Sequence, residues 1–265
     1  MQISPPKHLA PFIRHYIFLE NSGKDTRNVR LFTDGSSGLI LSGNMNLHSP
    51  FSGESMPLSF FYGALSSYKD FYSKGEFSLV AVVFQPYFLN MLIKASAKEV
   101  CDQIISVEDV LKNQLEPFQE KLLKKADPLS VINDLNIFFT EFLTDRMNAD
   151  YELIAAVQQY ILSHRGSVSS KDLERFTGYS ERHLERKFEN HMGLSPKKYG
   201  NIIRLHYFLS LLNKQSAHKN MTGLSYDAGY SDQSHLIKAF KNNIGLTPNQ
   251  YINTKNKMAV NFIEL

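Results

Sequence analysis

Short apolar runs separated by turn-forming residues predict β-strands up to about residue 85 of the 265-residue chain. Residues 77–84 (FSLVAVVF) are almost continuously apolar, which is the pattern of a strand covered on both faces. Residues 14–19 are rich in aromatic and β-branched side chains, and the turn at 35–38 precedes another apolar run at 39–41. Pro86 ends the longest run. We therefore expect a strand-rich first part.

Beyond this point the apolar residues recur at spacings of three and four, which predicts amphipathic helices. Residues 107–125 and 131–143 each carry such a face, with Asp127-Pro128 between them. These helices either pack within the first domain or couple it to a partner subunit. The polar stretch 146–150 predicts a domain boundary, and a further helix follows it and ends at Arg165-Gly166, where glycine can take the left-handed cap.

The most informative feature of the chain is an internal duplication. Gly178-Tyr179-Ser180 reappears 51 positions later as Gly229-Tyr230-Ser231. A second set returns 52 positions later, from His183, Leu184, Phe188, Gly193, Leu194, Pro196 and Tyr199 to His235, Leu236, Phe240, Gly245, Leu246, Pro248 and Tyr251. Because a solenoid needs three or more repeats, two copies indicate one small recognition unit used twice.

Each copy has the pattern of a helix, a tight turn and a second helix. Ser169 or Ser170 can cap the first helix, and Ser180 the second, because a serine oxygen accepts bonds from first-turn amides. In each second helix two apolar residues four apart face inward, so polar side chains gather on the opposite face. Such a helix fits the ~12 Å major groove of B-DNA. The predicted outward residues are Arg182, Glu185 and Arg186 in the first copy, and Gln233, Ser234, His235 and Lys238 in the second.

A helix over residues 196–213 connects the two copies and carries apolar residues for contact with both. At ~1.5 Å per residue it spans roughly 25 Å, which suits two recognition helices about one DNA turn, ~34 Å, apart. Phosphate contacts position a protein on DNA without reading sequence. The candidates for such contacts are Ser180, Lys187, Lys197, Lys198 and Lys241.

The charge distribution favours a nucleic-acid partner for the second half. Residues 1–150 carry 14 Lys+Arg and 17 Asp+Glu, whereas residues 151–265 carry 15 and 9. This asymmetry is expected when one half of a chain meets a polyanion. The alternative is that the basic residues merely keep a helical domain in solution.

Composition and local motifs exclude several classes of protein and several kinds of site. The single cysteine, Cys101, excludes an intramolecular disulfide, and no Cys/His cluster indicates a zinc site. No segment approaches the ~18 apolar residues of a membrane span, and the N-terminus lacks the pattern of a secretion signal. No nucleophile elbow or phosphate-binding glycine loop is present. We expect a cytoplasmic protein that is not an enzyme and uses neither a metal nor a cofactor.

Two segments carry a resemblance to a known family. Residues 173–188 run LERFTGYSERHLERKF, and residues 229–251 show the spacing G-Y-x-D-x-S-H-[LF] … F-K … G-x-T-P-x-x-Y. Over about residues 150–256 the chain resembles AraC/XylS-type transcription regulators. The resemblance implies that the second helix of each unit enters the major groove and reads bases with the outward residues given above.

The chain departs from this family at several positions. Glu174 and Ser225 stand where the family usually has alanine. Lys238 stands where arginine is common, so bidentate reading of guanine is not expected there. Phe208 replaces a customary small residue on the connecting helix. From these differences we expect the first unit, with its two arginines, to carry more of the sequence specificity.

Segments 7–16, 34–35 and 84–87 resemble the sensor portion of a subset of these regulators. This resemblance implies a small β-barrel or jelly-roll-like domain followed by helices, which binds an effector or mediates dimerisation. Aromatic residues of this part either line an apolar effector pocket or fill the domain core. They are Phe12, Tyr16, Phe18, Phe60, Phe61, Tyr62, Phe71, Tyr72 and Phe77.

We therefore predict an α+β protein of two domains. Residues 1–149 form the N-terminal sensor or dimerisation domain, and residues 150–256 form an all-α DNA-binding domain with helix-turn-helix units at about 169–192 and 221–244. Residues 257–265 are a tail. The predicted partner is double-stranded DNA, and RNA polymerase, a small-molecule effector and a second copy of the chain are further candidates; no membrane is involved. Two alternatives remain: an enzyme with a DNA-binding appendage, and a module that binds protein helices.

Overall fold

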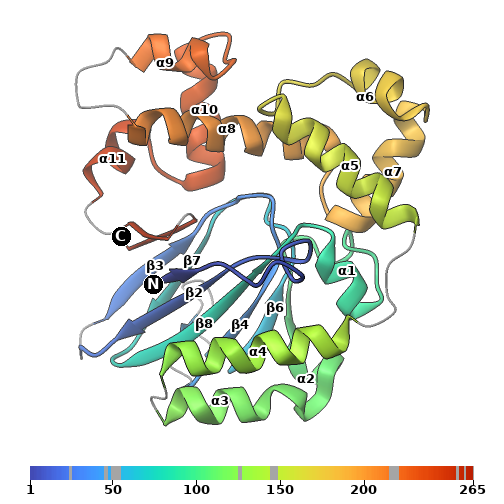
Figure 1. Ribbon diagram of the computed structural model, residues 1–265. Helices are drawn as coiled ribbons and strands as arrows, with labels where there is room; N and C mark the ends of the chain where they lie inside the picture. The colour runs from blue at the N-terminus through green and yellow to red at the C-terminus, as the bar shows by residue number, and fades with distance from the viewer. Residues whose placement is uncertain are drawn as a thin grey trace.

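The computed structural model describes residues 1–23, 26–44, 47–48, 55–124, 127–143, 149–214, 221–254, 257–259 and 261–264. Figure 1 shows a strand-rich N-terminal part beneath a helical C-terminal part. Most of the domain boundary expected at 146–150 lies outside the described residues. No helix in the described ranges is long and apolar enough to cross a membrane.

Strands of the described residues form two antiparallel sheets. The six-stranded sheet has the order β1 (Gln2–Ile3), β2 (Ile13–Asn21), β8 (Phe77–Phe84), β4 (Gly38–Ser42), β6 (Ser59–Tyr62) and β9 (Ile104–Ser106). The five-stranded sheet has the order β10 (Lys257–Ala259), β11 (Phe262–Glu264), β3 (Arg27–Leu31), β7 (Lys69–Ser73) and β5 (Leu47–His48). Side chains from both sheets share one core, so the sheets stack face to face.

Strand β8 confirms the prediction of a strand covered on both faces. Val80, Val82 and Phe84 point into a core shared with helices, while the alternate residues Leu79 and Ala81 point into the core between the sheets. The helices on the outer face are α1 (Phe88–Ile93), α2 (Val107–Leu111), α3 (Glu116–Leu123) and α4 (Pro128–Phe142). Figure 1 shows α3 and α4 side by side below the sheet.

Two predictions for this part need correction. The helix expected over 107–125 is broken, because Lys112 has a positive φ of 50° and a short 3-10 helix (Lys112–Leu115) separates α2 from α3. Strand β9 lies after the expected end of the strands near residue 85 and completes the edge beside β6. The expected architecture was a β-barrel or a jelly-roll-like domain, and the described strands form two separate sheets that do not close into one barrel.

The C-terminal domain consists of consecutive helices, as its apolar spacing predicts. They are α5 (Ala149–Ser163), α6 (Ser170–Thr177), α7 (Glu181–Met192), α8 (Pro196–Lys214), α9 (Met221–Asp227), α10 (Gln233–Ile244) and α11 (Pro248–Asn253). Gly166 has a φ of 78°, so the cap expected after α5 is present.

The tail after α11 returns to the N-terminal domain. Strand β11 pairs antiparallel with β3, with Phe262 opposite Leu31 and Glu264 opposite Val29. Figure 1 shows these C-terminal strands, in red, beside the blue strands of the N-terminal domain. Residues expected only to form a tail therefore extend a sheet whose neighbouring strand lies more than two hundred positions earlier in the chain.

Candidate nucleic-acid interface

The first helix-turn-helix unit is built by two local caps. Ser169 and Asp172 form a reciprocal capping box at the start of α6, which satisfies free first-turn amides. Gly178 ends α6 with a φ of 75°, a backbone conformation that costs glycine nothing. This turn sets the direction in which α7 leaves α6.

Helix α7 divides into a buried and an exposed face. Leu184 and Phe188 are buried in the core of the first unit, whereas Arg182, Glu185 and Arg186 are exposed. The three side chains expected to face DNA therefore lie outside the core, on one helical surface. His183, beside them, is half-buried, with its ring stacked on that of Tyr179 at a centroid distance of 4.9 Å.

The start of α7 is capped from α6. The expected cap, Ser180, makes no side-chain capping bond. Instead the carboxylate of Glu174 accepts a hydrogen bond from the main-chain N–H of Glu181 at 2.6 Å. In the sequence, Glu174 differs from the family pattern, and no local signal identifies it as a cap.

In the second unit the recognition helix α10 has the same division. Leu236 and Phe240 are fully buried. The outward positions that the repeat predicts for this helix are all exposed: Gln233, Ser234, His235 and Lys238. Asp232 caps the helix by accepting from the His235 N–H at 2.8 Å, and this bond helps hold the pKa of its carboxyl below the usual value.

Helix α8 joins the two units by entering both cores. Tyr199 and Ile203 belong to the core of the first unit, and Leu205 and Phe208 to that of the second. The Phe208 ring meets that of Phe240 edge-on at a centroid distance of 6.0 Å. The large side chain at this position is therefore accommodated against the base of the second recognition helix.

The phosphate-contact candidates fall into two groups. Ser180, Lys197, Lys198 and Lys241 are exposed. Lys187 is half-buried and pairs with the Asp150 carboxylate of α5 at 2.5 Å. The ammonium group of Lys187 is therefore engaged within the domain. No local sequence pattern connects this residue with α5, so the pair could not be predicted from the sequence.

The N-terminal domain contacts the last turn of each recognition helix. On the first, Ala97 N–H donates to Asn190 O at 2.7 Å, and Lys98 pairs with Glu189 at 2.6 Å. On the second, the Arg30 guanidinium donates to Ile244 O at 3.1 Å. The outward residues lie nearer the opposite end of each helix, so these contacts leave them exposed.

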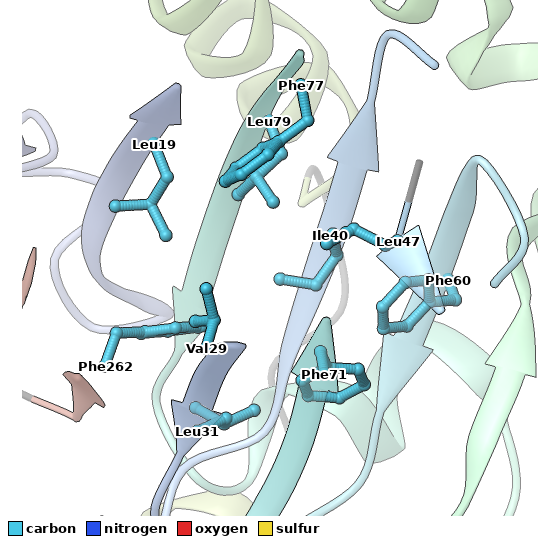
Figure 2. Close-up of a pocket in the computed structure, with 10 residues that line it drawn as sticks. All are labelled: Leu19, Val29, Leu31, Ile40, Leu47, Phe60, Phe71, Phe77, Leu79 and Phe262. Carbon is cyan, nitrogen blue, oxygen red and sulfur yellow. The ribbon is translucent and has the colours of Figure 1, made fainter. Parts of the chain in front are cut away.

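A small apolar cavity lies between the two sheets of the N-terminal domain. It has a volume of about 20 Å³, and Figure 2 shows the side chains around it. They are Leu19, Val29, Leu31, Ile40, Leu47, Phe60, Phe71, Phe77, Leu79 and Phe262. Of the aromatic residues proposed to line a pocket, Phe60, Phe71 and Phe77 do so, whereas Phe12, Tyr16 and Phe61 pack in the core beneath the helices.

No described His, Cys, Asp or Glu side chains gather in threes to hold a metal ion. Cys101 is half-buried with its Sγ 3.2 Å from Ala64 O, and burial raises the pKa of its thiol to about 11. A thiol with so high a pKa stays protonated and is a weak nucleophile near neutral pH. Cys101 therefore acts as a small packing residue.

Comparisons with known proteins agree with this architecture. Residues 173–254 match a family described as a helix-turn-helix domain, and residues 1–106 match a domain of unknown function, DUF6597. An uncharacterised HTH-type transcriptional regulator of Haemophilus influenzae is 30% identical over 146 residues, which cover 55% of this chain and 45% of that protein. The regulator YbfI of Bacillus subtilis is 36% identical over 70 residues, 26% of this chain and 24% of YbfI.

The chain thus spans less than half the length of these relatives. Among solved structures, ToxT of Vibrio cholerae aligns over 89% of this chain and 97% of its own, with 14% identity and a TM-score of 0.48. A probable AraC family regulator of Rhodopseudomonas palustris aligns over 37% of this chain and 93% of its own, with 22% identity and a TM-score of 0.35. Residues 173–254 are therefore similar to the helix-turn-helix domain of AraC-type transcription regulators.

Proposed function

We propose that the chain binds duplex DNA sequence-specifically by placing α7 and α10 in successive major grooves. The observation that carries this proposal is the matched exposure of the two helices. Each buries an apolar face in a core shared with α8 and leaves its outward polar residues open. Arginine donates two hydrogen bonds to guanine, and amide and hydroxyl groups bond base edges, so these side chains suit groove reading.

The first unit is proposed to read more of the sequence. It presents Arg182 and Arg186 beside Glu185, which can accept a bond from a cytosine amine. The second presents Lys238, a compact charge without the fork geometry of arginine. We assign phosphate contacts to the exposed Ser180, Lys197, Lys198 and Lys241. Lys187 is not among them, because its ammonium group pairs with Asp150.

Selection of bound sequences from a random DNA pool tests this proposal. The full chain should enrich two short sequence elements about 10 base pairs apart, the spacing of one helical turn. Its affinity should fall steeply with added salt, because phosphate neutralisation releases counterions. Enrichment of no sequence, or binding that does not respond to salt, would refute the DNA-binding assignment and favour a module that binds protein helices.

A second function is favoured by the cavity between the sheets. Every lining side chain is apolar, so an uncharged apolar molecule is the ligand class that suits it. We propose that such a molecule controls the regulator from the N-terminal domain. Titration with the uncharged fluorophore N-phenylnaphthylamine should show a saturable, single-site fluorescence increase, and its absence would refute ligand control at this cavity.

A further inference from the structure

The C-terminal strand β11 has one face in each domain. Successive residues of a strand point to opposite sides. Phe262 is 4% exposed and belongs to the core between the two N-terminal sheets, whereas its neighbour Ile263 is fully buried in the core of the second helix-turn-helix unit. The same short strand therefore completes two hydrophobic cores at once.

The side of β11 that faces the sheets also forms a wall of the cavity, through the ring of Phe262 (Figure 2). The cavity, at about 20 Å³, has room for about one water molecule. Any larger apolar molecule therefore has to displace a wall. Most side chains that line the cavity belong to strands of four to nine residues, but two of the lining strands are shorter: β5 has two residues and β11 has three. Of these two short strands, β11 is the one whose opposite face packs against the second helix-turn-helix unit, through Ile263.

Beside β11, strand β3 holds the end of the second recognition helix. Ile263 lies opposite Arg30 in the register of the two strands. The Arg30 guanidinium donates to both carboxylate oxygens of Asp70, at 2.6 and 2.7 Å, and lies over the Tyr68 ring at 4.0 Å. Its remaining nitrogen donates to Ile244 O at the last residue of α10. Departure of β11 would thus expose the strand that orients α10.

We propose that β11 is a latch through which the cavity controls the second recognition helix. Entry of an apolar molecule displaces Phe262, the strand separates from β3, and Ile263 leaves the core of the second unit. That unit then loses its fixed position against the N-terminal domain, while α8 still joins it to the first unit. This inference rests on the proposed function, since it takes DNA binding and an apolar ligand from it and adds the route between them.

The test measures hydrogen exchange and DNA binding of the full chain with and without N-phenylnaphthylamine. Peptides covering 27–32 and 257–264 should exchange faster with the fluorophore present, while a peptide covering 79–83 in β8 should not change. The dissociation constant for the selected DNA should shift by about fivefold or more, the usual lower bound for coupled sites. Fluorophore binding that leaves both the exchange and the DNA affinity unchanged would overturn the latch.

Two matched variants separate the latch from general damage. Phe262→Ala enlarges the cavity, so the fluorophore should bind more tightly without displacing the strand, and DNA affinity should no longer respond to it. Ile252→Ala, at an exposed position of α11, should respond like the parent chain. A full response to the fluorophore in Phe262→Ala would contradict the proposal.

Failure of the underlying function has a different signature. If the parent chain binds selected DNA but not the fluorophore, ligand control is refuted and the latch is tested without a ligand. Ile263→Asp forces a charge into the core of the second unit and should release β11, and Ile263→Ala should do so partly. Both should change DNA affinity, the first by about fivefold, in chains whose circular dichroism remains helical. Unchanged DNA affinity in both folded variants would overturn the latch.

Discussion

The carboxylate of Glu174 in α6 accepts a hydrogen bond from the main-chain N–H of Glu181, the first residue of the recognition helix α7. The side chain of Glu181 in turn accepts from the Ser170 hydroxyl at 2.5 Å. Two carboxylates therefore stand at the positive end of the helix dipole. The free amides of a helix N-terminus are also groups that would bind a phosphate.

From this relationship we predict that Glu174→Gln strengthens DNA binding by about fivefold, because it removes a negative charge worth about 1 kcal/mol at a helix terminus. The amide oxygen can still accept the bond from Glu181, so the free energy of unfolding should fall by no more than the value of the lost charge, about 1 kcal/mol. Fluorescence anisotropy with selected DNA measures the first effect. Glu116→Gln, an equal change of charge at an exposed site of α3, should leave DNA affinity unaltered; an equal gain in that control would assign the effect to net charge alone.

Arg182→Ala combined with Arg186→Ala should lower affinity for the selected DNA by about 100-fold, because each bidentate contact contributes roughly 1–3 kcal/mol of base discrimination. Binding to unrelated DNA should fall much less. Competition with selected and scrambled duplexes measures both quantities.

The double variant Lys197→Ala with Lys198→Ala is the control for the double arginine variant. These exposed lysines are proposed phosphate contacts, so their loss should weaken all sequences alike and reduce the slope of log affinity against log salt by about 2. Loss of sequence preference in the lysine variant, with preference kept in the arginine variant, would reverse our assignment.

Gly35→Ala should weaken the contact between the N-terminal domain and the linker helix α8. Gly35 has a φ of 76°, and a Cβ there would lie 2.6 Å from the Tyr199 ring, which is 1% exposed. We expect about 1 kcal/mol from the left-handed backbone and about 2 kcal/mol from overpacking. Denaturant unfolding measures the sum.

Gly75→Ala supplies the matched control for this change. Its φ of 79° is nearly the same, but nothing lies within 4 Å of a Cβ at that position. It should therefore show the backbone cost without the clash. Equal destabilisation by both variants would mean that Tyr199 yields freely to the added methyl group.

The stability of the fold should fall in mild acid because of a histidine, His15, that is buried in the N-terminal domain. Burial is the main cause that lowers the pKa of His15 from 6.5 to about 4; Asp34 opposes the shift and Arg14 adds to it. The unfolded chain therefore takes up the proton more readily. The His15 contribution is complete above about pH 6.5 and decreases as the pH falls towards 4, by roughly 3 kcal/mol.

Burial also lowers the pKa of His206, which adds a contribution of the same sign. Unfolding by urea at a series of pH values between 7 and 4 measures the slope, and His15→Gln should make it shallower. An identical slope in the parent chain and in His15→Gln would show that the acid sensitivity has another source.

Much of the candidate interface could be predicted because it depends on local spacing. The duplication places apolar residues four apart in α7 and α10, and the helical period then puts the remaining polar side chains on the opposite face. Those side chains are exposed in the structure at every position that the repeat indicates. The pairing of Lys187 with Asp150 was missed, because nothing in the local pattern of either segment indicates which side chain of another helix will lie nearby.

The amino-acid sequence by itself determined the strand β8, the helices of the two units and the faces that they expose, since these follow from periods of two and 3.6 residues within one segment. Only the tertiary structure decided what covers those faces. Three residues near the C-terminus are too few to predict a strand from the sequence. In the structure they pair with β3, and this pairing puts Phe262 in one core and Ile263 in another. Burial on both sides stabilises that segment as a strand, and this burial comes from contacts between distant parts of the chain.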